Sequence, residues 1–249
     1  MPKTSLIASI LSWWQDEAAR DGFFPAVKQF ILTLWEFARE STPSRRRQRY
    51  GDVEYDWDFR VDTTSATVGW RDRLLGHFHS PYQPTEPTLF REMIESLMQV
   101  APTINLREFT FIDIGSGKGR ALLLASQYPF RRILGIELLP ELHRVAKENI
   151  SKYKSDSQRC FAIDCVLADG GEFTFPAEPT VLYLFNPLPE SGLVRVITNL
   201  EQSLREYPWP VFVIYHNPLL EHVVTRNGVL TRIAGAREYS IFSRNDAGF

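Results

Sequence analysis

Three glycines stand close together in the run DIGSGKGR, at residues 113–120. An apolar strand is predicted before this run and an apolar helix after it. Glycine permits a sharp turn and a close approach of a ligand to the backbone, and parallel sheets bind ligands at the strand ends where such turns lie. A plain strand-to-helix turn is the simpler interpretation of the run alone. The candidate binding residues in it are Asp113, Gly115, Ser116, Gly117 and Gly119.

The spacing of these glycines discriminates between cofactors. A dinucleotide-binding turn reads G-x-G-x-x-G. Arg120 stands where its third glycine would be, and Gly119 comes one residue earlier. The phosphate-binding pattern G-x-x-x-x-G-K-[ST] does not match the run either. The turn therefore disfavours a nicotinamide dinucleotide, and it is not a P-loop.

Carboxylates follow the next two predicted strands as well. Glu137 ends the second strand, where a carboxylate can accept both hydroxyls of a ribose, and we expect it to face solvent. Asp169 lies in the turn after the third strand, where it could accept an adenine amino group. Glu137 could instead be a helix-start carboxylate beside Pro140, and Asp169 an ordinary turn residue. Carboxylates at three successive strand ends nevertheless favour a ligand that contains a nucleoside.

The stretches DIGSGKGRALLLAS, GIELLPELHRVAKENI, LADGGEFTFP and YLFNPLP together resemble the class I S-adenosylmethionine-dependent methyltransferases. The resemblance covers residues 108–245. Within that family the chain is similar to small bacterial methyltransferase-like proteins that carry a Y-x-P-T element before the domain, here Tyr82 to Thr85. A comparable element occurs in some protein lysine methyltransferases. The resemblance implies S-adenosylmethionine as the cofactor.

The same resemblance assigns a role to each candidate residue. It implies that Asp113 and the glycine turn hold the methionine end of the cofactor, that Glu137 binds the ribose, and that Asp169 binds the adenine amine. S-adenosylmethionine carries no pyrophosphate, so no phosphate-binding lysine is needed. Its sulfonium is already an activated electrophile, so the protein mainly has to align the acceptor with the methyl group.

The acceptor side of the sequence is less specific. Asn186 and Pro187 follow the fourth predicted strand, where amine-directed members of the resembled family often carry [DNS]-P-P-[FYW]. The second proline and the aromatic residue are missing here, which disfavours a nucleobase amine, and Asn186 could equally be a turn residue before proline. His216 ends the fifth strand and could act as a base or be structural. We expect the catalytic residues among Asn186, Tyr82 and His216.

Short apolar strands alternate with helices after Pro87, which predicts a parallel sheet covered on both faces. The expected strands are 109–114, 133–137, 161–167, 181–185 and 211–215, with a final hairpin at 229–233 and 239–243. The expected fold class is α/β, a doubly wound, mostly parallel seven-stranded sheet of the Rossmann-like methyltransferase kind. The resemblance adds that the last strand is antiparallel.

An N-terminal helical or irregular segment, 1–84, is expected as a lid or substrate platform before a methyltransferase domain at 85–249. Apolar residues at helical spacing over 27–38 predict an amphipathic helix. That helix would pack on the domain or, less favourably, lie on a membrane surface. The basic run at 45–49 is typical of a solvated linker. No clear periodicity assigns residues 50–84.

The composition is ordinary for a globular protein, with 44% hydrophobic and 23% charged residues. A net charge of −2 gives no overall attraction to nucleic acid or anionic membranes, so nucleic acid is not an expected partner. Two cysteines form no disulfide framework and are too few for a zinc site, so no metal is expected. No secretory signal is evident and no apolar run is long enough to span a bilayer. We therefore expect a cytoplasmic location.

The expected activity is methyl transfer from S-adenosylmethionine to an unidentified acceptor, a protein lysine or another amine. One alternative is a small-molecule O- or N-methyltransferase, because the aromatic residues within 50–84 could form a small pocket. Another is a non-catalytic S-adenosylmethionine-binding scaffold protein. A nicotinamide dehydrogenase is disfavoured by Arg120. The sequence names neither the acceptor atom nor the oligomeric state.

Overall fold

The computed structural model of the chain describes residues 18, 22–24, 27–28, 30–31, 53–64, 84–185 and 188–244. The chain divides into two compact units. One unit consists of Met1–Val53 with Thr64–Gln83, and the other of Glu54–Thr63 with Pro84–Phe249. The second unit contains the sheet. Part of the segment expected to precede the domain, Glu54–Thr63, is thus packed within it.

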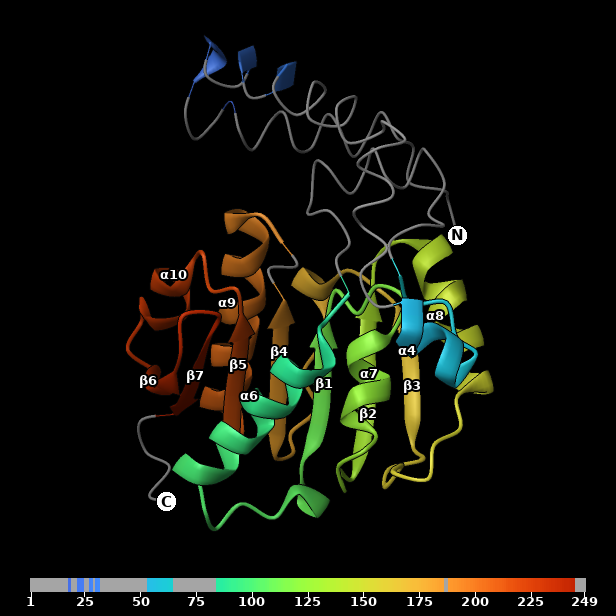
Figure 1. The fold of residues 1–249 in the computed structure, drawn as a ribbon. Coiled ribbons are helices and arrows are strands. Elements are labelled where there is room, and N and C mark those ends of the chain that lie inside the picture. Colours follow the sequence, from blue (N-terminus) through green and yellow to red (C-terminus); the bar gives the residue numbers. More distant parts are fainter. Residues whose placement is uncertain are drawn as a thin grey trace. The chain divides into compact units, whose positions relative to one another are not determined.

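Seven strands form one sheet in the order β3-β2-β1-β4-β5-β7-β6 (Figure 1). The strands are β1 Thr110–Ile114, β2 Arg132–Glu137, β3 Ile163–Leu167, β4 Thr180–Phe185, β5 Val211–His216, β6 Leu230–Gly235 and β7 Tyr239–Arg244. The first five strands pair in parallel, whereas β7 runs antiparallel to both β5 and β6. The prediction of a mostly parallel seven-stranded sheet is confirmed, including the antiparallel last strand.

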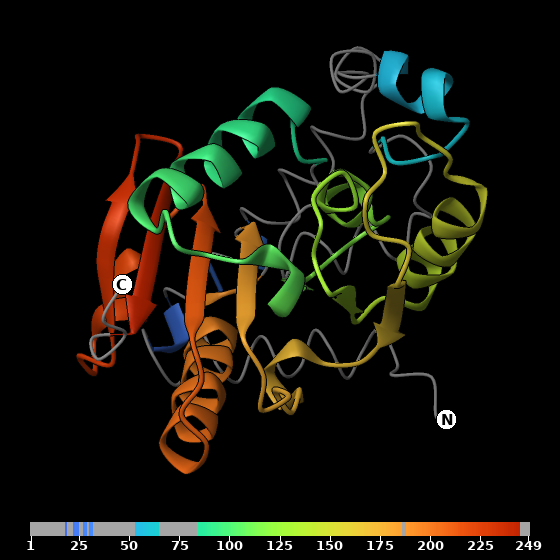
Figure 2. The same ribbon diagram turned by 90° about the horizontal axis from the view of Figure 1, so that it is seen from below.

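Helices cover both faces of this sheet (Figure 2). The α-helices are α4 Val53–Phe59, α6 Pro87–Val100, α7 Arg120–Ala125, α8 Pro140–Lys152, α9 Glu190–Glu206 and α10 Glu221–Thr225. One apolar core packs α6 and α7 against one face, and a second packs α9 and α10 against the other. A sheet buried on both faces needs apolar side chains in both directions. For this reason β1, β4 and β5 are almost fully buried, without alternation.

Helix α6 begins where the sequence predicted it. Pro87 occupies its first turn, and the side chain of Glu86 accepts hydrogen bonds from the backbone N–H groups of Thr88 and Leu89. This cap satisfies two of the donors that the first turn of a helix leaves unpaired. The apolar stripe of the helix is buried and consists of Phe90, Met93, Ile94 and Leu97.

The structure departs from the predicted elements in two places. Strand β3 begins at Ile163, whereas the predicted strand began at Phe161. Phe161 is 77% exposed and lies in the loop that leads to this edge strand. Helix α4 falls within 50–84, which the sequence could not assign. Its ring pair Tyr55 and Phe59 packs on Tyr153 at the end of α8, so tertiary contacts support this short helix.

The predicted amphipathic helix at 27–38 is described only at 27–28 and 30–31, which are helical. The rest of it lies outside the described residues. Of the helices that the structure describes, none is long and apolar enough to cross a membrane.

Candidate functional site

The candidate residues gather at the carboxyl ends of the parallel strands. Asp169 follows β3, Glu137 ends β2, the glycine turn follows β1, and His216 ends β5. Strands β2 and β3 lie on one side of β1, and β4 and β5 lie on the other. The strand order therefore reverses between β1 and β4, and ligands of such sheets bind at the carboxyl edge of this reversal.

The glycine turn adopts conformations that require glycine. The φ angles of Gly115, Gly117 and Gly119 are +79°, +56° and +86°, a region that side chains with a Cβ rarely enter. The backbone N–H groups of Gly115 and Ser116 both donate to the carbonyl oxygen of Ile136, at 2.8 and 3.1 Å. The turn is thus fixed to the end of β2.

Ser116 is a candidate whose side chain points into the domain. Its hydroxyl lies 3.4 Å from the sulfur of Cys165 in β3, and the residue is only 4% exposed. A Cβ placed on Gly135 would approach the Ser116 hydroxyl to 2.6 Å, so the group is closely packed. Any contact of Ser116 with a ligand would therefore come from its backbone.

Glu137 lies beneath the glycine turn and not in solvent as the sequence led us to expect. It is 5% exposed, and its two carboxylate oxygens accept the N–H groups of Gly117 and Leu139, each at 2.7 Å. Burial raises the pKa of this carboxyl, although the backbone donors act in the opposite direction. Each carboxylate oxygen has a second lone pair, so Glu137 can hold the turn and accept ligand hydroxyls as well.

Asp113 is the second buried carboxylate of the site. It is 3% exposed, and within the described part of the chain no hydrogen bond reaches its side chain. Burial raises its pKa well above the usual range, and the neighbouring charge of Glu137 raises it further. Two buried carboxyls with raised pKa values, close to each other, form a site that a cationic group would stabilise.

Asp169 acts partly as the turn residue that the sequence offered as an alternative. Its Oδ1 accepts the N–H of Gly171 at 2.8 Å, and its Oδ2 lies 3.6 Å from a guanidinium nitrogen of Arg195. The side chain keeps 29% of its surface exposed. It can therefore still receive a donor at the open side of the edge.

Two exposed leucines beside these carboxylates were not singled out from the sequence. Leu138 follows Glu137 and is 40% exposed, and Leu167 pairs with Glu137 in the sheet register and is 42% exposed. An apolar ring placed on them would remove this surface from water, which stabilises binding by about 25 cal/mol per Å². The sequence could have indicated these two residues, because Leu138 follows Glu137 directly and Leu167 lies two residues before Asp169.

His216 belongs to a buried polar chain at the end of β5. Its Nδ1 lies 2.8 Å from the hydroxyl of Tyr183, which in turn lies 3.1 Å from the hydroxyl of Thr85. The imidazole stacks on Phe185 at 3.7 Å between ring centroids. Burial lowers the pKa of His216 to about 4. A base this weak cannot deprotonate an alkylammonium, whose pKa is about 10, so the structural alternative is favoured for His216.

The buried imidazole of His216 should make the free energy of unfolding decrease at acidic pH, which can be tested. Because the folded-state pKa of His216 lies below the unfolded value of about 6.5, its stabilisation is complete above pH 6.5 and is lost as the pH falls towards 4. The loss amounts to about 3 kcal/mol. We expect this component to vanish from urea-unfolding curves of His216→Gln, whereas His222→Gln, at an exposed histidine, keeps it. Parallel pH profiles for wild type and His216→Gln would contradict the assignment.

Tyr82 and Asn186, the other two catalytic candidates, lie outside the described residues. Their neighbours are described: Thr85 closes the Y-x-P-T element and is 3% exposed, and Phe185 ends β4 immediately before Asn186.

Lys118 and Arg120 have a role in the turn that the sequence did not reveal. Lys118 is fully buried, and its ammonium lies 2.8 Å from a carboxylate oxygen of Asp62. The guanidinium of Arg120 lies 3.2 Å from Asp56. In the sequence, Arg120 was informative only as an argument against a dinucleotide-binding turn. Nothing in the sequence indicated that Asp56 and Asp62 would contact the turn.

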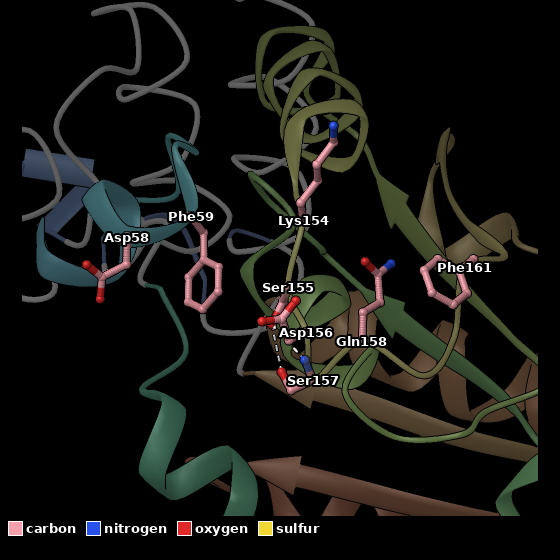
Figure 3. A pocket seen from close by; sticks show the side chains of 8 residues that line it. All are labelled: Asp58, Phe59, Lys154, Ser155, Asp156, Ser157, Gln158 and Phe161. Atoms are coloured by element: carbon pink, nitrogen blue, oxygen red, sulfur yellow. Dashed lines mark hydrogen bonds between the residues drawn. The ribbon is translucent and has the colours of Figure 1, made fainter.

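A hollow of about 620 Å³ lies away from these residues (Figure 3). Phe59 at the end of α4 borders it on one side, and Gln158 and Phe161 border it on the other. Its full lining is Asp58, Phe59, Lys154, Ser155, Asp156, Ser157, Gln158 and Phe161. The loop 153–162 leads into the amino end of β3, whereas the candidate residues stand at the carboxyl ends. The hollow is therefore not part of the candidate site.

The cysteines and acidic residues of the described ranges do not assemble a metal centre. No group of three His, Cys, Asp or Glu side chains within those ranges is placed to hold a metal ion. Cys160 and Cys165 are both free and buried. Burial raises the pKa of Cys165 to about 12, so this thiol stays protonated at neutral pH.

The strand order, the glycine turn after β1 and the acidic end of β2 are those of a doubly wound, mostly parallel α/β sheet with an antiparallel last strand, the fold that the sequence resemblance implies. The sequence matches no protein-family model, and no curated protein matches it significantly. By structure the chain is similar to an RNA methyltransferase from Salinibacter ruber in complex with S-adenosyl-L-homocysteine. The two are 22% identical over 65% of this chain and 92% of that chain, with a TM-score of 0.42.

Two further solved structures are similar. One is a glycopeptide N-methyltransferase complexed with S-adenosyl-L-methionine, 10% identical over 65% of this chain and 94% of that chain, with a TM-score of 0.45. The other is a dimethyladenosine transferase from Plasmodium falciparum, 12% identical over 66% of this chain and 62% of that chain, with a TM-score of 0.45. The fold assignment rests on the strand order of the chain itself.

Proposed function

We propose that this chain binds S-adenosylmethionine at the carboxyl edge of the sheet and catalyses transfer of its methyl group to an amine, such as a protein lysine. The observation that carries the proposal is the pair of buried carboxylates, Asp113 and Glu137, beside a glycine turn with left-handed φ angles at the strand-order reversal.

The residues of the edge fit the parts of this cofactor in order. Asp113, buried and without a hydrogen bond from the described residues, is suited to the cationic amino group of the methionine end. Glu137 has lone pairs left for the ribose hydroxyls. Leu138 and Leu167 offer apolar surface to the adenine ring, and the exposed part of Asp169 can accept its amino group. The bound cofactor would supply an activated methyl group.

The chemistry of the acceptor follows from the groups near β4 and β5. His216 is too weak a base to deprotonate an ammonium group, so the amine would have to arrive neutral. Asn186 and Tyr82 would then act as neutral partners, a carbonyl oxygen and a phenol that orient the nitrogen lone pair. A nucleobase amine is not proposed, because the motif after β4 departs from the pattern of enzymes that use one.

Replacement of Glu137 by glutamine should weaken binding of S-adenosylhomocysteine by about 10- to 100-fold, because a hydrogen bond to a charged group is worth about 1.5–3 kcal/mol. Glutamine preserves the shape of the side chain. Glutamine keeps one oxygen as an acceptor, although its amide NH2 would face the N–H of Gly117 or of Leu139, whereas alanine would leave both N–H groups without an acceptor. Isothermal titration calorimetry measures the effect, and Glu206→Gln at an exposed position is the control. Wild-type affinity in a folded Glu137→Gln variant would remove Glu137 as the ribose ligand.

Transfer of a labelled methyl group from S-adenosylmethionine to fractionated cell lysate tests the activity without assuming an acceptor. Label in a protein fraction, recovered as methyl-lysine after hydrolysis, is the expected result. Label in a small-molecule fraction would favour the small-molecule methyltransferase alternative. Tight cofactor binding with no labelled fraction would favour the non-catalytic scaffold alternative and contradict the proposed activity.

A further inference from the structure

The segment Glu54–Thr63, here called the strap, packs on the domain beside α8 (Figure 1) and forms ion pairs with two basic residues at the glycine turn. Asp62 of the strap pairs with the fully buried Lys118 of the turn. Arg120, at the first position of α7 and 1% exposed, reaches Asp56 with one guanidinium nitrogen and donates to the Thr63 hydroxyl with its Nε. Both basic side chains next to Gly119 therefore pair with the strap.

The strap is organised internally to present these acceptors. The carboxylate of Asp56 accepts the backbone N–H of Thr63 at 2.8 Å and also the Thr63 hydroxyl. The guanidinium of Arg120 lies over the ring of Tyr55, 4.2 Å from its centroid. The Asp56 carboxylate and the Tyr55 ring thus both contact the buried guanidinium of Arg120. Leaving such a buried charge without a partner would cost much free energy.

Asn149 of α8 joins the strap directly to the backbone of the turn. Its Oδ1 accepts the N–H of Asp62 at 2.8 Å, and its Nδ2 donates to the carbonyl oxygens of Asp62 at 2.7 Å and of Lys118 at 2.9 Å. The residue is 1% exposed. One amide therefore satisfies backbone groups of the strap and the turn at the same time.

Neighbouring residues of the turn are held by side chains from two different elements, β2 and α8. The N–H of Gly117 is held by Glu137, which the proposed function assigns to the ribose, and the carbonyl of Lys118 is held by Asn149. A loss of the strap would take from Lys118, Arg120 and Asn149 the contacts that the strap provides to them. Asn149 would keep its hydrogen bond to the Lys118 carbonyl but would lose the two bonds to Asp62 that orient its amide, so it would hold this part of the turn less firmly.

We propose that Asn149 is a positioning residue for the cofactor site, and that strap docking and cofactor binding are coupled through the Gly117–Lys118 backbone. This proposal rests on the proposed function. By thermodynamic reciprocity, a cofactor that favours the ordered turn must also favour the docked strap. The strap contacts described above go to Lys118, Arg120 and Asn149, none of which is assigned to the cofactor, so a response of the strap to cofactor binding reports the coupling.

Calorimetry and amide hydrogen exchange, both with S-adenosylhomocysteine, test the coupling. In the wild-type chain, saturating S-adenosylhomocysteine should slow exchange at the amides of Asp62 and Thr63. Asn149→Ala should weaken S-adenosylhomocysteine binding by about 5- to 20-fold and speed exchange of the same amides. The matched control is Asn227→Ala, because Asn227 also donates its amide to a buried acceptor, Glu201, but on the β6 side of the sheet.

A variant on the strap helps to distinguish coupling from direct damage to the turn. It also keeps the proposal testable if Asn149→Ala does not fold. Asp62→Ala removes a strap side chain and its ion pair with Lys118, leaves the hydrogen bonds of Asn149 to the strap backbone possible, and should weaken binding by about 3- to 10-fold. Wild-type affinity in Asp62→Ala, or no change in strap exchange on adding S-adenosylhomocysteine to the wild type, would overturn the coupling alone. A wild-type chain that does not bind S-adenosylhomocysteine would overturn the proposed function and the coupling with it.

Discussion

Replacing Asn186 by alanine is expected to lower methyl-transfer turnover by about 10- to 1000-fold, while the affinity for S-adenosylhomocysteine changes much less. Asn186 lies outside the described residues, directly after Phe185 of β4, and the central strands β1 and β4 flank the strand-order reversal. If the cofactor binds at this edge as proposed, we expect a side chain at that place to act on the methyl group and not on the ribose or adenine. We expect Asn186 to stabilise mainly the transition state of methyl transfer. The variant should therefore lower kcat and leave the Kd for the cofactor nearly unchanged.

Tyr82→Phe is the companion variant and should have a similar effect, because it removes only a hydroxyl. Both are measured with the acceptor identified by labelled transfer, as kcat and as S-adenosylhomocysteine Kd. Full turnover in both variants would place the active centre elsewhere. A loss of cofactor affinity in Tyr82→Phe, with turnover kept, would place Tyr82 in the cofactor pocket instead.

Arg120→Ala is expected to destabilise the fold by about 3–5 kcal/mol, since removing one partner of a buried ion pair leaves the other uncompensated. Arg120 is 1% exposed and its partner Asp56 is 11% exposed at the side chain. The ring of Tyr55 loses its cation at the same time. The effect belongs near the lower end of the range, because Thr63 still donates two hydrogen bonds to Asp56.

Urea unfolding at 25 °C followed by circular dichroism measures this loss. Arg144→Ala is the control, because Arg144 forms ion pairs with Glu141 and Glu148 but lies exposed on α8. Exposed pairs are weak, so the control should unfold close to the wild type. Equal unfolding midpoints for Arg120→Ala and Arg144→Ala would contradict a buried ion pair that stabilises the strap.

The fold could be predicted well because its signals are local. Apolar runs flanked by glycine or proline placed β1, β2, β4 and β5 within a residue of their observed ends, and Pro87 and Pro140 marked the starts of two helices. The start of β3 was predicted too early because Phe161 is apolar yet exposed. An edge strand has weaker burial, so its hydrophobic pattern is a poorer guide.

The candidate site was predictable to the extent that strand ends determine it. The positions of Asp113, Glu137 and Asp169 along one edge follow from parallel pairing alone. The burial of Glu137 could not be predicted in this way, because it depends on the glycine turn folding back over the carboxylate. The strap contacts of Lys118 and Arg120 were also hidden, since they join residues far apart in the chain and no local pattern couples them.

Calorimetric titration of the purified chain with S-adenosylhomocysteine, and separately with NAD, tests the central claim most directly. The structure positions two buried carboxylates and a glycine turn without the third glycine of a dinucleotide fingerprint. We expect saturable binding of S-adenosylhomocysteine and no comparable affinity for NAD. Tight binding of NAD with no binding of S-adenosylhomocysteine would contradict the account.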